Sequence, residues 1–333
     1  MLPYTKIVTL AGAFVWFGTG CVHAPEPSQP LESRTIETRR ELFEVSDATE
    51  AHLRKAAAAT ALLTHQSMVE EVSRGVYRLK ALTLRENVGD RTPWCSAANF
   101  TEQKTAGHCS GILVSRAALL TAASCIARVP CADTFVVFGY AMDSRSSDLR
   151  TPAREQVRRC VRLLHPGTSL GRIGGTAAPE DYVILQLDDA PGGDVRPATI
   201  TRDMPRKLTL MAHPLGLPLK ITDELTAISQ PKVRGTVAAG QHDTTRAKIA
   251  VAPSAVSAGA PMFDTATGSL AGIVTSTIGL DSAVEGDAMT AIYRSQDNGE
   301  ICRGWAQCRQ DVDSGSVTCP SIPVLGLAET ALH

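Results

Sequence analysis

The segment VSAGAPMFDTATGSLAGIV, residues 256–274, contains two apolar runs of strand length on either side of a turn. The runs are PMFDTA and SLAGIV, and Thr267-Gly268 lies between them. This dipeptide is typical of a tight hairpin turn, because glycine takes positive φ without a steric penalty. We therefore expect two neighbouring antiparallel strands here.

The same pattern recurs along the chain from about residue 70 onward. Short apolar runs are separated by turn residues, without long helical periods between them, which predicts an all-β barrel or sandwich. Frequent glycine and proline disfavour a helical bundle. The other runs are FVVFGYAM (135–142), YVILQLDD (182–189), KLTLMAHP (207–214), AKIAVAP (247–253) and MTAIYRS (289–295).

Composition and charge indicate a globular domain. The 333 residues are 44% hydrophobic and 20% charged, which is enough to bury a sizeable core, and the formal net charge is −1. Lysine and arginine are dispersed along the chain, so nothing points to a nucleic-acid partner or to an anionic membrane surface.

The N-terminus has the pattern of an export signal. Lys6 precedes an apolar run, residues 7–17, that is too short to span a bilayer, and small residues lead to Cys21. Residues 1–21 resemble a bacterial lipoprotein signal, although that pattern usually has leucine where this chain has Gly18. The resemblance implies a lipid on Cys21 that anchors the protein in the cell envelope, in the outer membrane or periplasm, and is its sole membrane contact. The alternative is a secreted protein cut after Ala24, at a bond that the following proline disfavours.

Between this signal and the predicted strands we expect a tether and a short helix. Residues 22–46 are predicted to be a flexible tether, since the first part is rich in proline, serine, glutamate and threonine. Residues 47–70 form a lead-in whose alanine-rich part favours a helix, with Ser46 or Asp47 as its N-cap. A strand can begin near Ala59.

Cysteine content agrees with export. Nine cysteines become eight if Cys21 carries lipid, and an even number in an oxidising compartment indicates disulfides. There is no CxxC pair to favour zinc, so neither a metal nor a cofactor is predicted. The number of possible pairings is too large for the spacing to fix one. The eight are Cys95, Cys109, Cys125, Cys131, Cys160, Cys302, Cys308 and Cys319.

Four segments in one order resemble the trypsin-like serine proteases. CSGILVSRAALLTAASC (109–125) is similar to the family segment that ends in Thr-Ala-Ala-His-Cys, and EDYVILQLDD (180–189) to its aspartate strand. AHPLGLPLKI (212–221) resembles a segment of the bacterial subgroup related to glutamyl endopeptidases. Residues 256–274 resemble the nucleophile segment Gly-Asn-Ser-Gly-Ser-Pro-Val-Phe and the strand after it.

The resemblance implies a fold of two six-stranded antiparallel β-barrels packed around a cleft. The first barrel would span residues 71–200 and the second residues 201–325, followed by a tail, 326–333. It also implies a disulfide between Cys109 and Cys125 across the first barrel.

Residue by residue, the resemblance implies a dismantled active site. The general-base histidine corresponds to Ser124, the nucleophile to Ala258, and an oxyanion-hole glycine to Val256. The aspartate is kept as Asp181, and Gly259 keeps the glycine that follows the nucleophile. A hydroxyl has no pKa near 7 and a methyl group cannot attack a carbonyl, so hydrolysis is not expected.

The preferred hypothesis is an inactive homologue, a pseudoprotease, that binds a peptide or protein in the cleft between its barrels. One alternative is an active serine endopeptidase with a non-standard site, for which Ser257, Ser254 or Ser124 would be the nucleophile. Another is a structural or interaction lipoprotein that binds through its C-terminal loops. Glutamate preference is not expected, because Val274 stands near the place of the relatives' substrate-reading histidine. The histidines available to a rebuilt site are His108, His165, His213 and His242.

Overall fold

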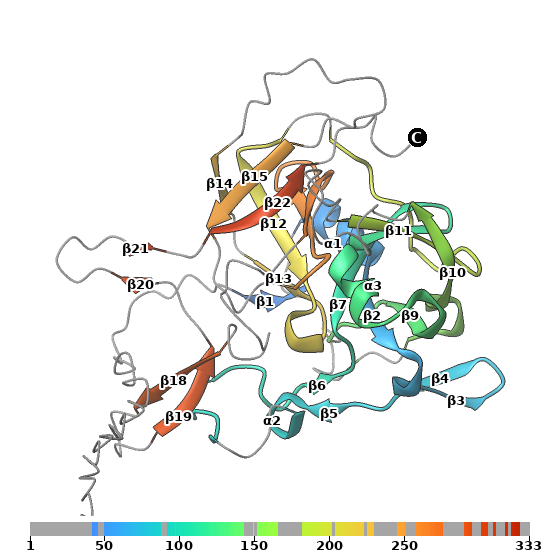
Figure 1. Cartoon of the computed structure of the whole chain (residues 1–333), viewed down its shortest axis with the longest axis horizontal. Coiled ribbons are helices and arrows are strands. Elements are labelled where there is room, and N and C mark those ends of the chain that lie inside the picture. The colour runs from blue at the N-terminus through green and yellow to red at the C-terminus, as the bar shows by residue number, and fades with distance from the viewer. Residues whose placement is uncertain are drawn as a thin grey trace, which may run out of the picture.

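The structure is a computed structural model dominated by β-strands (Figure 1). Each of the strand-length runs predicted from the sequence contains a strand. The residues that the structure describes are 42–45, 50–87, 92–96, 98–142, 149, 152–165, 182–201, 204–222, 225–229, 245–250, 257–275, 290–294, 301–305, 309–310, 317–318 and 321–326.

The first half of the chain forms a closed barrel of six antiparallel strands, in the order β10-β11-β8-β7-β2-β9. This is the six-stranded barrel expected in the first half of the chain, and its first strand begins at Thr60, eleven residues before the expected start at residue 71 and inside the predicted lead-in. Closure leaves no free edge among these strands. The strands are β2 (Thr60–His65), β7 (Cys109–Ser115), β8 (Ala118–Ala122), β9 (Thr134–Phe138), β10 (Val157–His165) and β11 (Tyr182–Leu187).

The second half forms an eight-stranded sheet in the order β1-β13-β12-β14-β15-β22-β17-β16, in which β12 also pairs with β16. The β12–β16 pairing joins the two ends of the run β12-β14-β15-β22-β17-β16, and the short strands β13 and β1 extend the sheet beyond β12, so a separate second barrel is not confirmed. One of them, β1, lies in the predicted tether, so flexibility does not extend to residues 42–45. The strands are β1 (Phe43–Glu44), β12 (Lys207–Ala212), β13 (Lys220–Ile221), β14 (Leu225–Ser229), β15 (Thr245–Ala250), β16 (Pro261–Asp264), β17 (Leu270–Val274) and β22 (Ser321–Gly326).

The β16–β17 hairpin is the turn predicted from the sequence. Gly268 has a φ of +70°, and its N–H donates to the carbonyl of Asp264 at 2.8 Å. The hydroxyl of Thr267 donates to the Asp264 carboxylate at 2.8 Å. The positive φ explains why glycine is suited to this turn.

The predicted helix is α1 (Ala51–Ala59), which runs directly into β2. Its N-cap is Glu50, whose side chain makes no capping hydrogen bond, so the predicted caps Ser46 and Asp47 are wrong. Leu53 and Ala56 on this helix are buried in the main hydrophobic core. Burial of its apolar face stabilises the helix where the cap does not.

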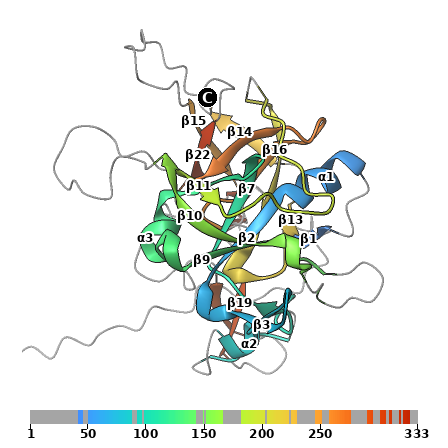
Figure 2. The same cartoon turned by 90° about the vertical axis from the view of Figure 1, so that its right-hand side faces the viewer.

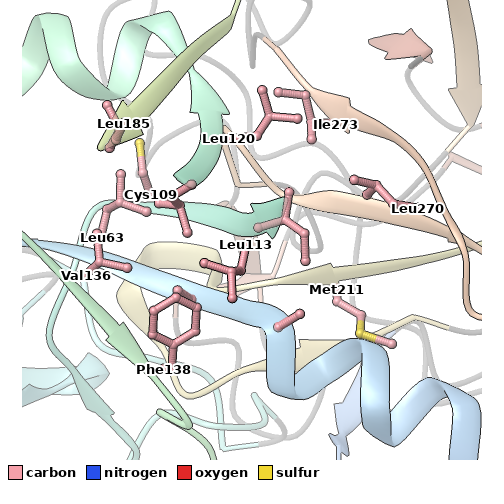
Figure 3. Packing of buried hydrophobic residues seen from close by; sticks show 14 of the residues in the cluster. Leu63, Cys109, Leu113, Leu120, Val136, Phe138, Leu185, Met211, Leu270 and Ile273 are labelled. Carbon is pink, nitrogen blue, oxygen red and sulfur yellow. The ribbon is translucent and has the colours of Figure 1, made fainter. Parts of the chain in front are cut away.

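The two halves share one hydrophobic core. Leu113 and Leu120 from the barrel belong to the same buried cluster as Met211 and Ile273 from the sheet, and Figure 3 shows these side chains facing one another. A shared core fixes the position of the barrel relative to the sheet.

Smaller elements surround these two layers. In both views, α2, β3 and β19 lie at the end of the molecule opposite to β14, β15 and β22 (Figure 1 and Figure 2). None of the helices in the described part of the chain is long and apolar enough to cross a membrane. The smaller strands and helices are β3 (Val69–Ser73), β4 (Val76–Leu79), β5 (Leu82–Thr83), α2 (Leu84–Asn87), β6 (Lys104–Thr105), α3 (Ala123–Arg128), β18 (Thr290–Arg294), β19 (Ile301–Trp305), β20 (Arg309–Gln310) and β21 (Val317–Thr318). The 3-10 helices include η2 (Gln66–Met68), η3 (Cys131–Asp133), η4 (Arg154–Gln156) and η5 (Pro214–Gly216).

Disulfides join segments that are far apart in the sequence. Cys109 is bonded to Cys125, as the resemblance implied, and the other two pairs are Cys95–Cys302 and Cys131–Cys160. The Cys95–Cys302 bond attaches β19 to a loop 207 residues earlier. Cys21, Cys308 and Cys319 lie outside the described residues.

Candidate active site

Three segments of the chain meet where the sequence places the catalytic positions: the start of β7, the end of β8, and the turn 257–260. Gly259 in this turn has a φ of +77°, and a Cβ at its position would overlap the carbonyl oxygen of Ser110 and the hydroxyl of Thr121. The backbone of the turn can approach the barrel this closely because residue 259 has no side chain.

Ala258 is fixed in this turn by backbone hydrogen bonds. Its carbonyl accepts from the N–H of Ser110 at 2.9 Å and lies 3.6 Å from Sγ of Cys125. On its other side, the Gly259 N–H donates to the Val274 carbonyl at 2.8 Å. Ala258 is 3% exposed, so its methyl group is covered by neighbouring atoms and belongs to the main core.

Ser124 is the neighbour in sequence of a residue that contacts the turn 257–260. It is an exposed residue in the first turn of α3, directly before Cys125, whose sulfur touches the Ala258 carbonyl. Asp181 and Val256 lie outside the described residues. The residue after Asp181, Tyr182, pairs with Ala122, two residues before Ser124.

Ser257 is part of a buried polar network. The Ser110 hydroxyl donates to Oγ of Ser257 at 3.1 Å and accepts from the backbone N–H of His213 at 2.9 Å. Ser110 and Ser257 are both buried, at 0% and 6% exposure. The network links the barrel to the second sheet, and little of the Ser257 side chain is exposed.

Two of the candidate histidines, His108 and His213, have lowered pKa values. His213 is buried, and its Nδ1 is 2.9 Å from the Leu217 carbonyl. Burial lowers the pKa of His213 to about 3, and burial together with the nearby Arg128 charge lowers the pKa of His108 to about 4. Both imidazoles are therefore neutral at pH 7. The side chain of His165 and all of His242 lie outside the described residues.

One serine and one histidine side chain do form a hydrogen bond, away from this site. Oγ of Ser67 is 2.8 Å from Nδ1 of His65, and the Ser67 N–H donates to the same nitrogen at 3.1 Å. His65 is the N-cap residue of η2, so this contact is a local cap.

The described residues give little support to other chemistry at the site. None of their clusters has three or more His, Cys, Asp or Glu side chains placed to hold a metal ion. Val274, near the place of the relatives' substrate-reading histidine, is fully buried at 0% exposure. A buried aliphatic side chain offers no hydrogen bond to a substrate carboxylate.

Sequence reasoning missed two polar groups of residues. The first is Ser110 with its partners: it bonds to Ser257 and Ala258 in the turn and to the His213 N–H before η5. The second is a buried ion pair between Lys220 and Glu44, to which Gln103 also bonds. The available signal was the lysine within the apolar run LPLKI, because lysine is rarely fully buried without a partner.

The barrel, the turn that Gly259 shapes, and the Cys109–Cys125 bond define a trypsin-like peptidase scaffold. Residues 109–273 match the family model described as the trypsin-like peptidase domain. The chain therefore belongs to the trypsin-like, chymotrypsin-fold family.

Solved structures of similar shape include two proteins of low sequence identity. One is an inactive form of Rv3671c from M. tuberculosis H37Rv in which a serine is replaced by alanine. Its sequence is 10% identical to this one, the match covers 78% of this chain and 85% of that chain, and the TM-score is 0.37. The other is HL collagenase: 12% identity over 78% of this chain and 92% of that chain, TM-score 0.39. A search of curated proteins found no match.

Proposed function

We propose that this protein is a catalytically inactive trypsin-like peptidase homologue of the cell envelope that acts by binding a peptide or protein. The proposal rests mainly on the turn 257–260, in which Ala258 stands at the position that the family resemblance assigns to the nucleophile, and the Ala258 carbonyl oxygen accepts from the Ser110 N–H at 2.9 Å. The neighbouring general-base position holds Ser124.

The chemistry of these two residues argues against hydrolysis. A methyl group has no lone pair with which to attack a peptide carbonyl, and a serine hydroxyl does not accept a proton at neutral pH. In serine proteases, loss of the nucleophile or the base lowers turnover by about 10⁶-fold, and loss of both lowers it little further. Either loss alone is therefore enough to prevent efficient hydrolysis.

The retained scaffold favours a binding role. Gly259 lets the turn approach the barrel closely, and the Cys109–Cys125 bond joins the start of β7 to α3 beside that turn. A peptide bound beside Ser124 and Ala258, at the junction of the two halves, would stay uncut. We propose the inter-barrel cleft as its binding site.

The envelope location rests on two features. The sequence of residues 1–21 resembles a lipoprotein signal, and three disulfides suit an oxidising compartment. Lipid on Cys21 would then be the sole membrane contact.

A peptide-capture experiment tests the binding role. The purified full chain is incubated with a library of extended peptides, and the bound fraction is identified by mass spectrometry. We expect retained peptides to be recovered intact, with weaker retention by a Ser124→Arg variant, whose long exposed side chain would crowd the site. Ala117→Arg, a change at the β7–β8 turn, serves as the control. Equal retention by all three proteins, or no retention at all, would contradict the binding role.

A further inference from the structure

A fully buried ammonium group lies at the edge of the second sheet. Lys220 on β13 has 0% exposure, and its Nζ donates to both carboxylate oxygens of Glu44, at 2.8 Å and 3.0 Å. It also donates to Oε1 of Gln103 at 2.6 Å. These three contacts satisfy the three N–H groups of the ammonium.

The surroundings of this ammonium are arranged for a carboxylate. Nε2 of Gln103 donates to Oε1 of Glu44 at 2.7 Å, so the Glu44 carboxylate receives hydrogen bonds from both side chains. Nζ of Lys220 also lies 4.6 Å from the centre of the Phe100 ring, a cation–π distance. Phe100 has a φ of 64°, which is uncommon for a residue with a side chain. The loop 100–103 is thus held in a defined shape on one side of the carboxylate.

The carboxylate itself comes from a short added strand. Glu44 belongs to β1, a two-residue strand at the edge of the sheet that pairs with β13 through Phe43↔Ile221 and Glu44↔Lys220 (Figure 1). Phe43 packs against the main core from a partly buried position. An extended segment that adds to a sheet edge and places alternate side chains in pockets is a known mode of peptide recognition.

We infer that the pocket of Lys220, Gln103 and Phe100, with the edge of β13, is a binding site for an extended peptide with an aromatic residue followed by glutamate. In this structure β1 fills the site in cis, and a segment of another polypeptide with the same chemistry would compete for it. This site does not include Ser124 or Ala258, so the inference does not depend on the proposed function.

The charge balance explains why the site should select a carboxylate. Removal of one partner from a buried ion pair leaves an uncompensated charge, which is strongly unfavourable. An emptied pocket would hold Lys220 facing Gln103 alone, so an incoming carboxylate restores the balance and an amide does not. The covalently attached β1 has an effective concentration on the order of millimolar, and it should exclude a weaker external peptide.

The test uses the full chain and a fluorescent peptide, RELFEVSD, which has the sequence of residues 40–47. In the variant F43P/E44A, β1 loses its ladder N–H and its carboxylate, so the edge and the pocket are both available. By fluorescence anisotropy we expect the peptide to bind this variant at least tenfold more tightly than it binds the unaltered chain. The peptide RELFQVSD, or the addition of K220M to the variant, should remove that gain.

Equal binding of the two peptides, or no gain in the variant, would overturn the inference. If F43P/E44A does not fold, the inference is tested on the single variant E44A, whose Tm is measured with and without propionate. A rise of several degrees in Tm with propionate, absent in the exposed-site control E70A, supports a carboxylate pocket. No rise overturns it.

Discussion

The backbone N–H of Ser110 donates to the carbonyl of Ala258 at 2.9 Å, which joins the second residue of β7 to the turn of the second sheet. The same serine uses its hydroxyl to bond Ser257 and to accept from the His213 N–H. Ser110 thus joins β7 both to the turn that contains Ala258 and to His213, the N-cap of η5. The scaffold of the site is maintained by contacts that do not depend on catalysis.

The close approach at Gly259 predicts a large loss of stability on substitution. Gly259→Ala combines a positive φ with overlap against backbone, and we expect a loss of about 3 kcal/mol or more in the free energy of unfolding. The control is Gly193→Ala, since Gly193 has a similar φ of +70° but open space around it. There we expect about 1 kcal/mol. Denaturant unfolding measures both, and equal losses would contradict the packing of the turn.

The buried histidines predict acid sensitivity. Because burial lowers the pKa of His213 to about 3 and that of His108 to about 4, the unfolded chain binds protons below pH 6.5 that the folded chain does not. The contribution of these histidines to the free energy of unfolding is thus fully present above pH 6.5. It falls by up to about 1.4 kcal/mol per pH unit for each histidine as the pH drops toward 4.

Denaturant unfolding between pH 4 and pH 7.5 checks this dependence. In H213N the steepness of the loss should be roughly halved, since one titrating group is removed. A slope in H213N as steep as that of the unaltered chain would show that His213 is not the responsible group.

The Lys220–Glu44 ion pair predicts a contrast between two glutamates. Glu44→Gln leaves a buried cation without its counter-charge, and we expect a loss of about 3–5 kcal/mol in the free energy of unfolding. Glu70→Gln, which removes the exposed ion pair with Arg78, should have no measurable effect. Similar effects from the two changes, compared by thermal unfolding, would contradict the burial of Lys220.

The Cys95–Cys302 bond predicts a local fluorescence change. Trp94 and Trp305 lie beside it with ring centroids 5.4 Å apart, and the chain's third tryptophan is Trp16, in the predicted signal peptide. In the double variant C95A/C302A we expect tryptophan emission to shift to longer wavelength as the pair separates. The unfolding midpoint should fall less than in C109A/C125A, whose bond lies within the barrel. Unchanged emission would show that the disulfide does not hold β19 in place.

Local patterns predicted much of the fold and of the site. The β16–β17 hairpin followed from Thr267-Gly268, and the Cys109–Cys125 bond followed from the family resemblance of residues 109–125. Local patterns could not predict contacts between residues far apart in the sequence, such as Glu44 and Lys220, which are separated by 176 positions. The tether prediction failed at residues 42–45 for the same reason: their order comes from a sheet edge supplied by the other half of the chain.

The central claim is the loss of hydrolytic chemistry at Ser124 and Ala258, and covalent labelling tests it most directly. The purified full chain is incubated with a fluorophosphonate, and its intact mass is measured beside that of an active trypsin-like protease. We expect no increase in the intact mass of this chain under conditions that label the protease completely. A stoichiometric adduct on any serine of the chain would contradict it.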